Sequence, residues 1–165
     1  MNIQRMIQHF MTGNMAVRAA FPARSLCAIE QTIRETEASH AGQIRFAVEA
    51  ALDFSALRHN QTASERAIEI FSQLRVWDTE HNNGVLIYVL LAERDVEIVA
   101  DRGIHAKLGQ AVWEEICRDM EAAFRGGKFE AGVIAGIHAV GSHLQRHFPR
   151  TSDPVNELPD KPVVL

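Results

Sequence analysis

The sequence lacks most features that would assign it directly to a membrane, secreted or metal-binding class. Its two cysteines, Cys27 and Cys117, form neither a CxxC pair nor any other zinc-ligand spacing, and we expect both to be reduced, buried thiols. No apolar run reaches the roughly 18 residues that span a bilayer. Polar residues also interrupt the N-terminal apolar segment, unlike the core of a signal peptide. We therefore expect a cytoplasmic protein without a transmembrane segment.

Charge and motifs narrow the function classes further. The chain has 17 Lys and Arg against 21 Asp and Glu, a net charge of −4, so no basic surface for nucleic acid is expected. The serines lie in no G-x-S-x-G context, and neither a phosphate-binding glycine loop nor a dinucleotide fingerprint is present. The sequence motifs therefore assign no catalytic residue and no reaction.

The composition that remains is that of a globular α/β domain. Of the 165 residues, 47% are hydrophobic, which is enough for one well-formed core. Hydrophobic periodicity predicts helices over 24–39, 62–76, 108–124 and 129–144, and strands over 43–52, 84–91 and 96–100, with a polar loop at 53–61. The last two strands are close enough to form a β-hairpin. We expect a three-layer α/β/α sandwich, in which helices cover both faces of a small mixed sheet with a central hairpin.

The two ends of the chain differ in composition. Apolar side chains recur at helical spacing in residues 1–12, at Ile3, Met6, Ile7, Phe10 and Met11. We expect this helix to bury them against the domain or a second copy. After Arg150 the tail is polar and proline-rich, which is typical of disorder. The predicted organisation is an N-terminal helix and connector over 1–20, a domain over 21–149 and a disordered tail over 150–165.

Polar residues gather where the two hairpin strands begin and end. In an antiparallel pair these ends are adjacent, and the preceding loop is expected at the same edge. Carboxylate and amide oxygens suit Ca²⁺ or Mg²⁺, bound weakly, toward the millimolar end of the range for protein sites. The predicted metal ligands are Asp78, Asn82, Asn83 and Asp101, with Arg102 and His105 beside them as an anion-binding pair. The alternative is that the Asn and Asp residues form Asx-turns and satisfy backbone groups at strand ends.

The same region carries a resemblance. The segment NNGVLIYVLLAERDVEIVADRGI, over 82–104, and the segment FRGGKFEAG, over 124–132, resemble the TPM domain family, and the resemblance spans about 24–148. It implies an α/β/α fold. Family members are mostly secreted or membrane-anchored. Because we expect neither a signal peptide nor a membrane segment in this chain, it is similar to a soluble, bacterial-like branch. The resemblance also implies a cation-binding acidic motif before the first helix, but the matching segment here, RAAFPARSL, has no carboxylate.

Two functional hypotheses stay open, and whether the protein is an enzyme is not decided by the sequence. The first is a non-enzymatic interaction module, which uses the sheet-end turn and the N-terminal helix to bind an unidentified protein. A membrane-associated partner would make this cytoplasmic protein peripheral to the membrane. The second is a metal-dependent phosphatase that hydrolyses phosphomonoesters at the cluster around Asp78 and Asp101. This second hypothesis follows from the phosphatase activity attributed to some TPM domain proteins.

Overall fold

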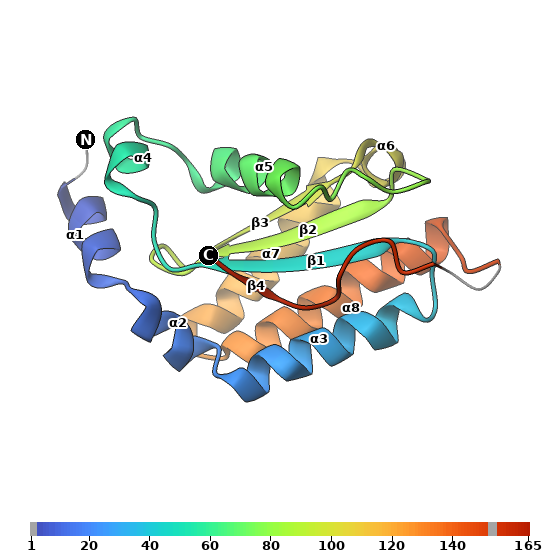
Figure 1. Ribbon diagram of the computed structural model, residues 1–165, viewed down its shortest axis with the longest axis horizontal. Coiled ribbons are helices and arrows are strands. Elements are labelled where there is room, and N and C mark those ends of the chain that lie inside the picture. Colours follow the sequence, from blue (N-terminus) through green and yellow to red (C-terminus); the bar gives the residue numbers. More distant parts are fainter. Residues whose placement is uncertain (1–2, 152–154) are drawn as a thin grey trace.

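A four-stranded mixed sheet forms the middle layer of the computed structural model, which describes residues 3–151 and 155–165 (Figure 1). The strand order is β3-β2-β1-β4. The strands are β1 (Gln43–Glu49), β2 (Gly84–Leu90), β3 (Asp95–Ala100) and β4 (Val163–Val164). Strands β1 and β2 are parallel, and β2 and β3 form an antiparallel hairpin. The predicted hairpin is therefore confirmed.

Helices cover both faces of this sheet, which confirms the predicted α/β/α sandwich (Figure 1). One face carries α3 (Ala23–Glu37), α7 (Gln110–Arg125) and α8 (Phe129–His147), and the other carries α4 (Phe54–Arg58) and α5 (Ala63–Gln73). In β2 the side chains of Val85 and Ile87 enter the larger core, while those of Leu86 and Tyr88 enter the smaller one. Because side chains alternate between two covered faces, every residue of β1 and β2 is buried.

Short helices were not predicted from hydrophobic periodicity, because they contain too few residues to repeat a hydrophobic pattern. They are α2 (Asn14–Ala20), α4 and α6 (Arg102–Leu108). Residues 53–61 therefore do not form the predicted plain loop. Asp53 caps α4 by accepting a 2.8 Å hydrogen bond from the N–H of Ala56, which stabilises a helix start that hydrophobic spacing does not reveal.

The C-terminal tail is the clearest departure from prediction. Residues 155–165, here called the C-terminal strap, run beside β1 and end in β4, which pairs with β1 in parallel (Figure 1). The Oε1 of Gln43 accepts hydrogen bonds from the N–H groups of Glu157 and Leu158, at 2.9 and 2.8 Å. Leu158 is buried in the smaller core. The predicted disorder is wrong for 155–165, because composition does not register the partners that the open edge of β1 supplies; residues 152–154 lie outside the described ranges.

Two further expectations concern the thiols and the membrane. Cys117 is buried as predicted, whereas Cys27 is exposed. Among the helices formed by residues 3–151, none combines the length and the apolar character needed to cross a bilayer.

Candidate functional sites

The hairpin brings the predicted sheet-end residues together. The N–H of Asp101 donates to the carbonyl of Gly84 at 2.9 Å, and the N–H of Gly103 donates to the carbonyl of Asn82 at 2.9 Å. A Cβ at Gly103 would lie 2.5 Å from the same Asn82 oxygen, so a larger residue would push the two segments apart. Asn82, Asn83 and Asp101 therefore meet at one end of the sheet, as their positions in the hairpin predicted. Their role as metal ligands stays a prediction.

The side chains of these residues have structural duties. Asn83 is fully buried and its Nδ2 donates to the carbonyl of Ala41 at 3.1 Å, which ties β2 to the chain before β1. Asp101 is the N-cap of α6, and its Oδ1 accepts from the N–H of Arg102 at 2.7 Å. Asn82 adopts a φ of 50°, a left-handed conformation that asparagine tolerates better than most residues. These contacts match the alternative in which the cluster satisfies backbone groups.

The remaining predicted ligands lie at the surface. Asp78 is exposed and forms a 2.6 Å ion pair with Arg75, while Arg102 and His105 are also exposed. Across residues 3–151 and 155–165, no group of three His, Cys, Asp or Glu side chains has the geometry of a metal site. Two buried acceptors nevertheless have no hydrogen-bond partner, Asn83 Oδ1 and Asp101 Oδ2. The sheet end therefore offers two buried oxygens rather than an assembled carboxylate cluster.

A second candidate site lies at the opposite end of the sheet, where the N-terminal helix α1 (Ile3–Met11) covers the segments that follow β1 and β2 (Figure 1). The Nδ1 of His9 accepts from the N–H of Leu52 at 3.0 Å, and Gln8 donates to the carbonyl of Ala92. Both Arg5 Nε and His9 Nε2 lie 2.7 Å from Glu93 Oε1. The polar face of α1 thus holds the helix to the domain.

The apolar face of α1 points to solvent instead. Phe10 is 94% exposed and Ile3 is 69% exposed, and Phe54 at the start of α4 is 65% exposed. A groove of about 740 Å³ separates α1 from α4, with side chains of Leu52 and Leu57 along its other wall. The exposed residues that share this surface, here called the α1 face, are Ile3, Ile7, Phe10, Met11 and Phe54. The helix is confirmed. Of the two expected docking surfaces, the chain's own domain does not receive these side chains, and docking on a second copy stays a prediction.

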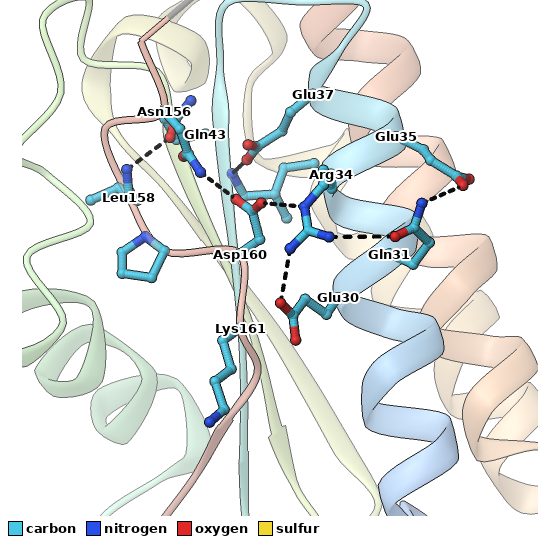
Figure 2. Close-up of polar contacts among 12 residues, drawn as sticks. Glu30, Gln31, Arg34, Glu35, Glu37, Gln43, Asn156, Leu158, Asp160 and Lys161 are labelled. Carbon is cyan, nitrogen blue, oxygen red and sulfur yellow. Dashed lines mark hydrogen bonds and ion pairs between the residues drawn. The ribbon is translucent and has the colours of Figure 1, made fainter.

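A partly buried polar network that the sequence analysis missed holds the C-terminal strap against α3 and β1. Figure 2 shows the Asp160 carboxylate between the strap and α3. Its oxygens lie 3.4 Å from Arg34 Nε and 3.0 Å from Asn156 Nδ2. Glu37 Oε1 accepts from the N–H of Ile44 at 2.7 Å. Burial raises the pKa of Glu37 to about 8, and the neighbouring Asp160 adds to the rise. The network was missed because it depends on a tail that was predicted to be disordered.

Carboxylates also gather between β3 and α7, beside the buried thiol. Burial raises the pKa of Asp95 to about 6 and that of Glu97 to about 7, and Glu121 adds to both shifts through its charge. Burial likewise raises the pKa of Cys117 to about 12. Since the thiolate is the reactive form of cysteine, Cys117 is held in its unreactive state.

Comparison with known proteins gives a consistent result. The family model described as the TPM domain matches residues 20–143. The solution structure of BA42, a protein from the psychrophilic bacterium Bizionia argentinensis, is similar with a TM-score of 0.75 and 28% identity, over 88% of this chain and 95% of that one. The N-terminal domain of a P. gingivalis protein shares the fold, with a TM-score of 0.63 and 19% identity over 81% and 85% of the two chains. No curated protein sequence gives a significant match.

Proposed function

The chain belongs to the TPM domain family, and we propose that it acts as a protein-interaction module whose contact surface is the α1 face. The observation that carries this proposal is the orientation of α1, which turns its polar side chains to the domain and its large apolar side chains to water. Scattered exposed apolar residues need no explanation, but a contiguous group of this kind typically marks a binding surface. Burying each large side chain would contribute about 1.5–3 kcal/mol.

A protein surface suits the α1 face better than a lipid surface does. Interfacial helices that bind anionic lipid carry several Lys or Arg residues beside their apolar face. In α1 the only Lys or Arg is Arg5, and it is paired with Glu93 in the domain. The chain as a whole has a net charge of −4. The proposed partner is therefore a protein, either free in the cytoplasm or attached to the membrane surface, in which case this protein would be peripheral to the membrane.

Site-specific photocrosslinking tests this role. A photoreactive residue is placed at Phe10 in one variant and at Ile68, which is 55% exposed on α5, in a matched control. We expect a defined protein adduct from position 10 that the control does not form. Excess unlabelled protein should compete for this adduct, whereas its Phe10→Gln variant should not. Adducts of the same kind from both positions would show that the α1 face has no particular binding role.

A second candidate function rests on the sheet end. The buried and unpartnered oxygens of Asn83 and Asp101 could accept a weakly bound Ca²⁺ or Mg²⁺ ion, as a metal-dependent phosphatase would need. With Asp78 paired to Arg75, the donor set present fits only a weak site. The carboxylate of Asp101 would hold the cation, and Arg102 and His105 would lie next to an incoming phosphate.

Two measurements test this second candidate. Titration with Ca²⁺ or Mg²⁺ should move backbone amide signals at residues 82–84 and 101–105, and hydrolysis of a generic phosphomonoester should then depend on the cation and on Asp101. An Asp101→Asn variant keeps an oxygen that can cap α6, so it separates loss of the charge from loss of the cap. Signals that stay still on titration, or hydrolysis that survives the substitution, would remove the phosphatase hypothesis.

A further inference from the structure

We infer that the partner of the α1 face is a second copy of this chain, related by a two-fold axis, with Phe10 of each copy seated in the groove between α1 and α4 of the other. This inference rests on the interaction role proposed above and names its partner. Three properties of the surface lead to it: its area, its shape and its lack of charge.

The area is close to what a stable dimer needs. Five side chains of the α1 face are each more than half exposed, from 55% at Ile7 to 94% at Phe10. With about 200 Å² for one large side chain, they present roughly 700 Å² of apolar surface. A stable interface buries about 800 Å² on each partner. The half-buried Met6, which lines the groove, would supply part of the remainder.

The shape is self-complementary. A two-fold interface brings the same surface together from both copies, so a projecting residue and the cavity that receives it must lie on one surface. Here the nearly fully exposed Phe10 lies at the edge of the groove of about 740 Å³ that Leu52 and Leu57 line. Methionines at positions 6 and 11 border the same surface, and their flexible side chains can adjust to an incoming ring.

The charge distribution permits two identical surfaces to approach. A two-fold contact places like charges near one another, and an isolated charge at its centre would be costly. None of the five residues of the α1 face is ionisable. The guanidinium of Arg5 and the imidazole of His9 face Glu93 inside the same copy. The surface therefore combines apolar area with no repulsion against itself.

Sedimentation equilibrium of the full-length protein, from micromolar to millimolar concentration, tests the inference. We expect a monomer–dimer equilibrium, and we expect Phe10→Gln to weaken it about 100-fold or more, because each dimer loses two buried rings. Ile68→Gln, a change of similar polarity at a site on α5 that is 55% exposed, should leave the equilibrium unchanged. In a mixed labelled and unlabelled sample, isotope-filtered spectra should show contacts between Phe10 and the methyl groups of Leu57 across copies.

Each other outcome overturns the inference in a distinguishable way. A wild-type protein that stays monomeric has no such dimer, and if position 10 still crosslinks to another protein, the interaction role stands with a different occupant. A dimer that survives Phe10→Gln uses another surface. A monomer that floats with phospholipid vesicles and loses flotation with Phe10→Gln assigns the face to lipid, and both proposals then fail. A monomer without crosslinks or flotation also removes both.

Discussion

The two ends of the chain illustrate opposite relations between composition and packing. Helix α1 has the apolar spacing of a core helix, yet it contacts the domain through Arg5, Gln8 and His9 and leaves Phe10 in water. The C-terminal tail after Arg150 is rich in proline and polar residues, yet its strap buries Leu158 and Asp160 and extends the sheet with β4. The difference teaches that the packing of a terminal segment depends on the hydrogen-bonding groups and pockets of the domain surface, and not on the hydrophobicity of the segment alone.

The strongest test of this comparison removes the apolar anchor of the strap. Leu158→Ala should lower the free energy of unfolding by about 2–4 kcal/mol, because a side chain that is only 7% exposed leaves a cavity in the smaller core. Urea denaturation followed by circular dichroism measures the change. Val155→Ala provides the control, since Val155 is 78% exposed in the same strap. If Leu158→Ala lowered the free energy of unfolding no more than Val155→Ala does, the strap would contribute little to stability.

The buried Glu37 of α3, next to Asp160 of the strap, predicts that the free energy of unfolding depends on pH. The raised pKa of Glu37 means that its contribution to stability is complete below its ordinary value of 4.5 and is lost as the pH rises through about 8. Glutamine keeps the oxygen that accepts from Ile44, without the charge. Glu37→Gln should therefore raise the free energy of unfolding by about 1–3 kcal/mol at pH 8, since one pKa unit is worth about 1.4 kcal/mol, and should change little near pH 4.

Denaturation curves of wild type and Glu37→Gln, recorded between pH 4 and pH 9, measure this difference. The exposed Glu35 on the same helix supplies a matched Glu35→Gln control, which should follow the wild type at every pH. A Glu37→Gln curve parallel to that of the wild type would show that Glu37 ionises as an ordinary carboxyl group.

A smaller, local effect on hydrogen exchange is expected where Arg5 and His9 of α1 contact Glu93. Glu93→Gln removes the negative charge that Arg5 and His9 share, while keeping the size of the side chain. Partly buried ion pairs of this kind contribute about 1 kcal/mol, so amides of residues 5–11 should exchange with solvent roughly five- to tenfold faster. Hydrogen–deuterium exchange measures this change, with Glu69→Gln on α5 as control. Unchanged protection of α1 would show that other contacts hold the helix.

The smallest effect on the free energy of unfolding is expected at Phe10, where the apolar helical spacing of the sequence predicts a large one. Phe10→Gln should change the free energy of unfolding of the monomer by less than about 0.5 kcal/mol, because the ring is 94% exposed. Thermal and urea denaturation at a concentration below that of any dimer measure it. A loss of 2 kcal/mol or more, comparable with that of Leu158→Ala, would mean that α1 buries its apolar face in solution and would reverse the comparison.

Prediction from sequence succeeded where neighbours along the chain decide the outcome. The helix predicted from residue 62 begins there as α5, with a capping box in which Thr62 and Glu65, three positions apart, exchange hydrogen bonds. The meeting of Asn82, Asn83 and Asp101 was predicted because a short turn between β2 and β3 leaves little freedom in their register. Whether these residues bind a cation was not predictable in the same way, because it depends on side-chain contacts such as those of Asn83 with Ala41 and of Asp78 with Arg75.

The sequence by itself determined the α/β/α layers, the hairpin and the family signature, because each depends on local periodicity and on connections between neighbouring segments. Only the tertiary structure decided which face of α1 meets the domain and whether the strap is ordered. Helical spacing reveals which side chains share a face, but two of the residues whose acceptors hold α1, Ala92 and Glu93, are more than 80 positions away. The strap likewise depends on the edge of β1 and on the side-chain oxygen of Gln43, both more than 110 positions away. The composition of the strap does not reveal these partners.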